Sequence, residues 1–275
     1  EINNKNKLNL LDRSTMVGIS DELRFWMDFV KSEEFNSNWL SNYEKTNQLQ
    51  SYVHEFIKNL DKSKGFLKVL DVGSGPVSQL IGTIDKEKIT TVDPLGALYE
   101  LILDYKKYKI NPPISCGGEF LNFEEKFDIV HVSNAIDHSQ DPRILFNKLV
   151  RACNPEGYLI VQGFEDEAIE ENWNGFHQYN FRYIPSEGKL FYFDKDLKPI
   201  ILSQKGDLKL SKKLSIPGNH KKWFIFISQK ASLVNEKYIK NINYKVSYSS
   251  YNDELNINLK SKLIYLEREL LNNKL

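Results

Sequence analysis

Two kinds of hydrophobic pattern alternate along the middle of this chain. Short runs that are almost wholly apolar predict buried strands, because a strand covered on both faces has no polar side. Between these runs, apolar residues recur every three or four positions, as on one face of a helix. Strands that alternate with helices predict an α/β fold with a parallel sheet wound on both faces. The predicted strands are Phe66–Val72, Ile89–Val92, Pro113–Gly118, a run that begins at Phe127, and Tyr158–Phe164.

Helices are predicted before, between and after these strands. Two amphipathic helices precede the first strand, the first of them capped by Ser20, and they predict an N-terminal helical lid. The alternative is that their aromatic residues are ordinary core packing. Val77–Ile84 is predicted as the helix after the first strand, and Asp141 with Pro142 predicts the start of another. The apolar stripes are Leu23, Trp26, Met27 and Val30; Leu49, Val53, Phe56, Ile57 and Leu60; and Leu98, Leu101, Ile102 and Tyr105.

The pattern changes after Phe164 and again near the end of the chain. Leu190–Phe193 and Ile200–Leu202 predict an inserted hairpin. Leu259, Leu263, Leu266 and Leu270 form a heptad-like stripe that predicts a C-terminal helix, which packs either on the core or on a second subunit of a homodimer. The predicted organisation is a lid over 1–62, an α/β core over 63–230 with a substrate insert at about 165–220, and a tail over 231–275.

Composition and charge limit the classes of binding partner that are expected. Hydrophobic residues make up 41% of the 275 residues and charged residues 27%, which is typical of soluble globular proteins. Lys and Arg together number 37, as do Asp and Glu, so no global field attracts nucleic acid. Two cysteines predict free thiols in a reducing cytoplasm. No run is long enough to cross a membrane, so a membrane is not expected as a partner. Nucleic acid is not expected either, because the net charge is zero.

A glycine turn follows the first strand. Gly73 and Gly75 let the backbone approach a ligand closely, and the chain has Ser78 where a dinucleotide fold would have a third glycine. Asp71 adds a carboxylate at the mouth of the turn, which disfavours a pyrophosphate and favours a ligand with positive charge. Asp93 ends the second strand 18 residues after Gly75, where an acid can accept hydrogen bonds from ribose hydroxyls. That acid suits a nicotinamide cofactor or S-adenosylmethionine.

These spaced motifs, over Phe66 to Phe164, resemble the class I S-adenosylmethionine-dependent methyltransferases. The resemblance implies a Rossmann-like, seven-stranded sheet whose antiparallel strand is Trp223–Ser228. It also implies S-adenosylmethionine as cofactor and S-adenosylhomocysteine as product, with the adenine beside Glu119 and Phe120. The predicted cofactor-binding residues are Asp71, Gly73, Ser74, Gly75, Asp93, Pro94, Glu119, Phe120, Asn134, Ala135 and His138.

Methyl transfer to a hydroxyl benefits from a general base. His177 is the predicted base, because it lies in a polar and aromatic insert after the fifth strand; the alternative is a surface or capping histidine. His131, inside an apolar strand, is predicted to be a core residue. Asp137 and the acidic run Glu165–Glu167 do not match a metal-binding pattern, so no metal is predicted and the run is interpreted as a solvated loop.

The acceptor is predicted from the aromatic insert. Trp26, Phe176, Tyr179 and Arg182 are the candidate substrate contacts, for a sugar, a nucleotide or a phosphate-containing metabolite; the aromatic residues could equally form a small core. The segments Asp21–Trp26 and Gly175–Tyr179 resemble methyltransferases of bacterial surface-polysaccharide biosynthesis, including those that methylate phosphoramidates. Two alternatives stay open: an NAD-dependent nucleotide-sugar enzyme, and a non-catalytic methyltransferase-fold partner subunit.

Overall fold

The computed structural model describes residues 13–32, 35, 51–65, 67–184, 189–195, 199–203, 210–215 and 222–230. They fall in one compact unit, Arg13–Leu233. Among these residues, no helix is both long and apolar enough to span a lipid bilayer. The predicted tail helix, with its leucine stripe and dimer contact, lies outside the described residues.

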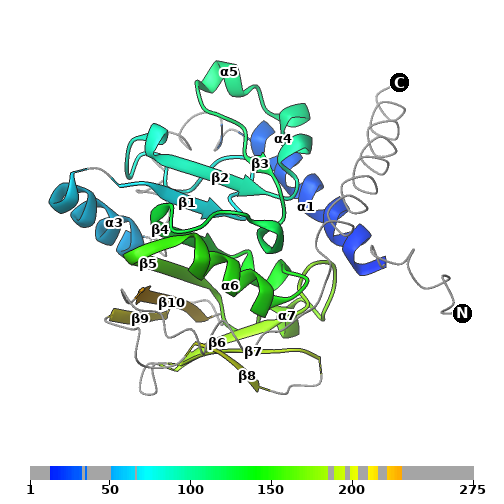
Figure 1. The fold of residues 1–275 in the computed structure, drawn as a ribbon. Coiled ribbons are helices and arrows are strands. Elements are labelled where there is room, and N and C mark those ends of the chain that lie inside the picture. Colours follow the sequence, from blue (N-terminus) through cyan, green and yellow to red (C-terminus); the bar gives the residue numbers. More distant parts are fainter. Residues whose placement is uncertain are drawn as a thin grey trace, which may run out of the picture. The chain divides into compact units, whose positions relative to one another are not determined.

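A mostly parallel sheet forms the centre of the fold (Figure 1). The strand order is β3-β2-β1-β4-β5-β10-β9, and the first five strands run parallel. Six strands from β3 to β10 form the body of this sheet, and β9 pairs with the outer side of β10. The predicted α/β class is therefore confirmed. The strands are β1 (Val69–Val72), β2 (Ile89–Asp93), β3 (Ile114–Ser115), β4 (Phe127–Ser133), β5 (Cys153–Phe164), β9 (Leu210–Ser215) and β10 (Lys222–Gln229).

Strand β10 runs antiparallel to β5, as predicted for Trp223–Ser228. A second, three-stranded sheet has the order β6-β7-β8 and is antiparallel throughout. It contains the predicted hairpin, with one strand added before it. Its strands are β6 (Asn180–Ile184), β7 (Lys189–Phe193) and β8 (Pro199–Ser203).

Successive residues of a strand point to opposite faces, and each face of the central sheet has its own core. On one face, Leu70 and Val72 pack with α6 (Pro142–Ala152) and with the small sheet. On the other face, Val69 packs with Val53 and Ile57 of α3 (Ser51–Lys64). The helix α6 begins as predicted, because the Asp141 carboxylate accepts hydrogen bonds from the backbone N–H groups of Arg143 and Ile144.

The predicted helix over Val77–Ile84 is wrong. This segment makes separate turns, with hydrogen bonds from Ile81 N to Ser78 O and from Thr83 N to Leu80 O. Gly82 has φ +89°, which a helix cannot contain, and the Ser78 hydroxyl takes the Leu80 N–H that a helix would use elsewhere. Local side-chain bonding therefore replaces helical bonding directly after the glycine turn.

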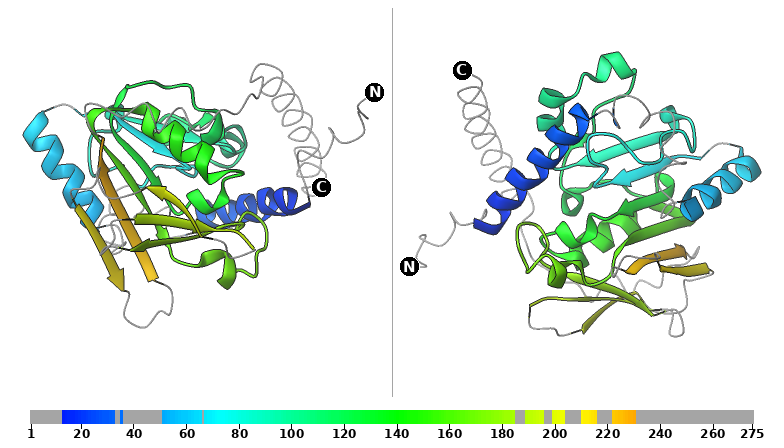
Figure 2. Two further views of the ribbon diagram at one scale, coloured as in Figure 1. Left: turned by 60° about the horizontal axis from the view of Figure 1, so that its bottom comes forward. Right: turned by 180° about the vertical axis from the view of Figure 1, so that it is seen from behind.

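Other boundaries also differ from prediction. Helix α1 (Arg13–Lys31) begins before Ser20, so Ser20 lies inside it and is no cap. The predicted stripe from Leu98 to Tyr105 is divided between two helices, and the third strand is only two residues long. The right view of Figure 2 shows the molecule from behind, with α1 (dark blue) in the foreground. The remaining helices are α4 (Gly96–Ile102), α5 (Tyr105–Tyr108) and α7 (Glu167–Glu170), and the short 3-10 helices are η3 (Lys86–Lys88), η4 (Gly118–Phe120) and η5 (Ile136–His138).

Candidate active site

The glycine turn joins three strands at their carboxyl ends. Gly73 and Gly75 have φ of +67° and +64°, which favours glycine. Gly73 N donates to the Val92 carbonyl at 2.8 Å and thereby ties β1 to β2. A Cβ on Gly73 would lie 2.4 Å from the Cβ of Ala135, so the turn also touches the segment after β4. Ligands of such sheets bind at this edge.

Asp93 ends β2 beneath this turn. Its Oδ2 accepts from Gly75 N at 3.0 Å, and its Oδ1 accepts from Leu95 N at 2.9 Å. Burial raises the pKa of Asp93 to about 6, although both amide bonds oppose the rise. Pro94 follows it directly, and the Ser74 hydroxyl, also buried, donates to Gly75 O at 3.0 Å. Each oxygen of an ionised carboxylate has two acceptor sites, and the backbone uses one on each oxygen. The second site on each can accept from a ribose hydroxyl.

The predicted place of Asp71 at the mouth of the turn is wrong. Its side chain is buried among β1 and β4, where Oδ2 accepts from Ser78 Oγ at 2.6 Å. Its Oδ1 lies 2.7 Å from His131 Nδ1. Asp71 lies on the same face as Val69, which packs against α3, and its charge is directed into that core. Asp71 therefore supports the glycine turn from within the core, through its bond to Ser78.

Glu119 and Phe120 lie in η4, after β3. The Glu119 Oε1 accepts from Gln140 N at 2.6 Å, so this carboxylate holds the loop that follows β4. Burial raises the pKa of Glu119. The neighbouring Gly118 approaches Val72 and Leu145 so closely that a Cβ there would lie 2.4 Å from a Leu145 methyl carbon. The predicted adenine wall is thus part of the edge formed by β1 and the loop after β4.

The segment from Asn134 to His138 joins the glycine turn to the predicted base. Asn134 has φ +48°, and its Oδ1 accepts from Phe164 N at 3.4 Å. Ala135 contacts Gly73, and two residues later Asp137 reaches the insert. Of the predicted cofactor residues after β4, Ala135 therefore lies beside the glycine turn, and Asn134 precedes it directly.

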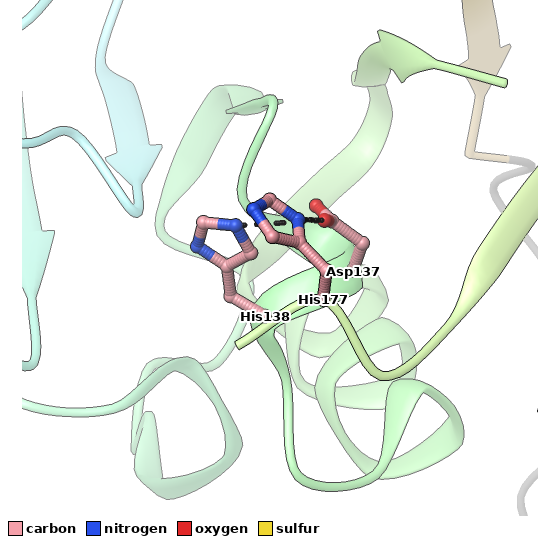
Figure 3. Close-up of side chains that lie close together, drawn as sticks. All are labelled: Asp137, His138 and His177. Carbon is pink, nitrogen blue, oxygen red and sulfur yellow. Dashed lines mark hydrogen bonds and ion pairs between the residues drawn. The ribbon is translucent and has the colours of Figure 1, made fainter. Parts of the chain in front are cut away.

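Asp137 and His177 form a hydrogen-bonded pair (Figure 3). Asp137 Oδ2 and His177 Nδ1 are 2.8 Å apart. Burial lowers the pKa of His177, but the bond to Asp137 and the charges of Asp137, Glu167 and Glu171 outweigh burial and raise it. Burial raises the pKa of Asp137, and the two neighbouring histidines lower it on balance. Sequence reasoning treated Asp137 only as a possible metal ligand, since 40 residues separate it from His177.

His138 completes a cluster of three potential metal ligands. One donor atom each of Asp137, His138 and His177 lies within 4.8 Å of the others, and the two rings meet edge to face at 4.7 Å between centroids. His177 Nδ1 lies 2.8 Å from Asp137 Oδ2, so an ion bound at these two atoms would have to replace their hydrogen bond. Glu165 and Glu167 are buried, so the acidic run is not the solvated loop that the sequence predicts.

One predicted substrate residue, Trp26, lies in α1, and another, Phe176, contacts this helix. Trp26 lies against the glycine turn, because a Cβ on Gly75 would be 2.7 Å from its indole carbon Cζ2. Phe176 contacts Gly18 of the same helix, where a Cβ would be 2.6 Å from the ring. Phe176 also lies 5.6 Å from His138 between ring centroids. Helix α1 therefore covers both the turn and the loop that carries His177, while Phe25 is exposed.

Tyr179 and Arg182 are held by other protein groups. The Tyr179 hydroxyl donates to Gln140 O at 2.9 Å. The Arg182 guanidinium donates to both oxygens of Asp166, with Nε–Oδ1 and Nη2–Oδ2 distances of 2.8 Å, and lies over the Phe193 ring. The predicted phosphate contact of Arg182 is not supported, because its planar donor group already binds a carboxylate.

Comparisons with known proteins give one family match. Residues 42–198, more than half of the chain, match the family described as Methyltransferase domain. No curated protein matches the sequence significantly. Solved structures with a similar fold include the N-methyltransferase NodS from Bradyrhizobium japonicum in complex with S-adenosyl-L-homocysteine, which is 10% identical over 76% of this chain and 99% of that chain, with a TM-score of 0.47. Another is the 1,6-didemethyltoxoflavin-N1-methyltransferase from Burkholderia thailandensis, which is 14% identical over 78% of this chain and 89% of that chain, with a TM-score of 0.42.

Proposed function

Because this chain belongs to the methyltransferase-domain family, and is thus an S-adenosylmethionine-dependent methyltransferase, we propose that it methylates a hydroxyl of a small metabolite with His177 as general base. One observation carries the proposal. Gly73 contacts Ala135, and Asp137, two residues later, binds His177. Cofactor turn and base are thereby joined by a single short segment.

On the cofactor side, the residues fit a nucleoside. Asp93 would accept from the ribose hydroxyls, and the glycine turn and the Asn134–Ala135 segment would enclose the rest of the molecule. The cofactor supplies an electrophilic methyl group. The protein then has to align the acceptor with that group and remove the proton of the acceptor.

On the acceptor side, the Asp137 bond fixes how His177 works. With a proton on Nδ1 directed at Asp137, the lone pair of His177 lies on Nε2. Nε2 can therefore take a proton from a hydroxyl, and the Asp137 carboxylate stabilises the imidazolium that forms. An anionic oxygen has no proton to lose, so a complete His–Asp pair favours an acceptor that must lose one, and a neutral hydroxyl is such an acceptor.

The acceptor is proposed to be a sugar-, nucleotide- or phosphate-containing metabolite of surface-polysaccharide biosynthesis. Support comes from Phe176, which lies beside His138 and below α1 and can stack on a sugar face. The resemblance of Asp21–Trp26 and Gly175–Tyr179 makes a phosphoramidate the alternative acceptor, and as an anion it would not need His177 as a base. A cytoplasmic location and a homodimer through the tail helix remain proposals.

The test measures formation of S-adenosylhomocysteine with panels of sugars, nucleotide sugars and phosphoramidates as acceptors. Turnover with a neutral hydroxyl acceptor supports the proposal. A melting temperature that rises with NAD and not with S-adenosylmethionine would indicate the nucleotide-sugar alternative. Weak cofactor binding, with turnover only after a second protein is added, would indicate a partner subunit.

Chelation is expected to leave activity unchanged. The hydrogen bond of 2.8 Å uses Asp137 Oδ2 and His177 Nδ1, and the proposed base needs His177 Nε2 for the acceptor proton, so the reaction is proposed to proceed without a metal. Activity is measured after dialysis against EDTA and again after addition of Mg²⁺, Mn²⁺ or Zn²⁺. Loss of activity on dialysis, with recovery on addition of one ion, would contradict this and assign the three-residue cluster to that ion.

A further inference from the structure

A chain of hydrogen bonds crosses four adjacent strands of the central sheet. Ser78 Oγ donates to Asp71 Oδ2 at 2.6 Å, and Asp71 Oδ1 lies 2.7 Å from His131 Nδ1. His131 Nε2 lies 2.9 Å from Gln162 Nε2, and Gln162 Oε1 accepts from Trp223 Nε1 at 3.3 Å. The chain thus runs from the glycine turn to β10.

The strand register places these side chains on one face. Asp71 is paired with His131, and Gln162 lies two residues after the partner of His131 on β5. Trp223 lies two residues before the partner of Gln162 on β10. Residues two apart share a face, here the face covered by α3. All four side chains are at most 3% exposed.

Only one assignment of protons satisfies the whole chain. The Trp223 indole can only donate, so Gln162 must present its oxygen to Trp223 and its NH₂ group to His131. His131 Nε2 must then accept, which leaves its proton on Nδ1, directed at Asp71. Trp223 therefore determines the tautomer of a histidine two strands away.

Both ends of the glycine turn depend on this chain. Asp71 lies two residues before Gly73, and Ser78 lies three residues after Gly75. The Ser78 oxygen also accepts from Leu80 N at 3.1 Å, so it holds the segment that replaces the expected helix. We propose that Ser78, Asp71, His131, Gln162 and Trp223 form a positioning relay that fixes the glycine turn for the cofactor.

Packing alone does not account for the relay. A buried polar group lowers stability unless each of its bonds is made, and an apolar side chain of similar shape is often as stable. A fully bonded network instead restricts the geometry of the groups at its ends. The relay is independent of His177, because it acts on cofactor binding and not on the acceptor.

The test compares two relay variants with a matched core variant. Ser78→Ala removes the bond to Asp71, and Trp223→Phe keeps the aromatic bulk but removes the donor. Ile225→Val is the control, because Ile225 is fully buried on β10 and pairs with Gln162 without joining the relay. Affinity for S-adenosylhomocysteine is measured by calorimetry, the melting temperature by thermal unfolding, and the His131 tautomer by ¹⁵N NMR.

We expect Ser78→Ala to weaken the affinity about fivefold to tenfold, the effect of losing one hydrogen bond of ordinary net strength. Trp223→Phe weakens it less and changes the ¹⁵N shifts of His131, whereas Ile225→Val lowers the melting temperature without changing affinity. The relay is overturned if wild-type His131 carries its proton on Nε2, or if Ser78→Ala binds like the wild type. Equal losses in Ser78→Ala and Ile225→Val would also overturn it. Failure of these results leaves the role of His177 untouched.

Discussion

Replacing His177 by Asn is expected to lower kcat by about a hundredfold to ten-thousandfold, the usual contribution of a positioned general base. Asparagine retains a polar side chain near Asp137 but cannot take the acceptor proton. The measurement is kcat with the true acceptor at saturating cofactor. Affinity for S-adenosylhomocysteine is the control, and it should stay at the wild-type value because His177 lies on the acceptor side. Undiminished turnover would mean an acceptor that is already anionic, such as a phosphoramidate.

The pH dependence gives a second measure of the same pair. The protonated imidazole cannot act as a base, so kcat falls as pH falls through the raised pKa of His177. Asp137→Asn removes the largest cause that raises this pKa, and the acidic limb of the profile should therefore move to lower pH. The maximal rate should also fall, because the imidazolium loses its carboxylate partner. A limb that stays in place would show that another group titrates.

Affinity for S-adenosylhomocysteine is expected to fall about tenfold between pH 7 and pH 5. The pKa of Asp93 is about 6, and only its ionised form can accept from both ribose hydroxyls, so the fraction able to bind decreases about tenfold over this range. Calorimetric titrations at several pH values measure this. Asp93→Asn is expected to bind about tenfold more weakly at pH 7 and to lose the pH dependence. A dependence that persists in this variant would contradict the role of Asp93.

Stability of the ligand-free protein is expected to change in the opposite direction. Because the folded pKa of Asp93 lies above its unfolded value of 3.8, its contribution to the free energy of unfolding is complete below about pH 4 and is lost as pH rises through about 6. The difference amounts to about 3 kcal/mol. Because the affinity for S-adenosylhomocysteine is expected to be higher at pH 7, the rise in melting temperature that it causes should be larger at pH 7 than at pH 5.

The fold could be predicted where the pattern was strong. Buried strands such as β1 and β4 have continuous apolar runs, and the Asp141–Pro142 pair indicates a helix start on chemistry alone. The turns over 77–84 could not be predicted, because the apolar spacing of this segment is compatible with a helix and only Gly82 indicates a turn. The Ser78 bonds that stabilise those turns depend on Asp71, a contact made in three dimensions.

The site shows a similar division. The positions of Gly73, Gly75 and Asp93 could be predicted, because a glycine turn after one parallel strand and an acid at the end of the next strand can both be identified from the sequence. The direction of the Asp71 side chain depends on His131, 60 residues away, and the role of Asp137 depends on His177. Arg182 is the opposite case: a scarce arginine in an aromatic insert suggested a phosphate, but Asp166 takes its donors. Tertiary partners, not residue type, decided these three roles.

The contacts of α1 have a thermodynamic consequence. Trp26 touches the glycine turn and Gly18 touches Phe176, and these two contacts lie about 12 Å apart along one helix. A ligand that stabilises these contacts at one end of α1 would also stabilise them at the other. We therefore expect methyl donor and acceptor each to raise the affinity for the other by the same factor.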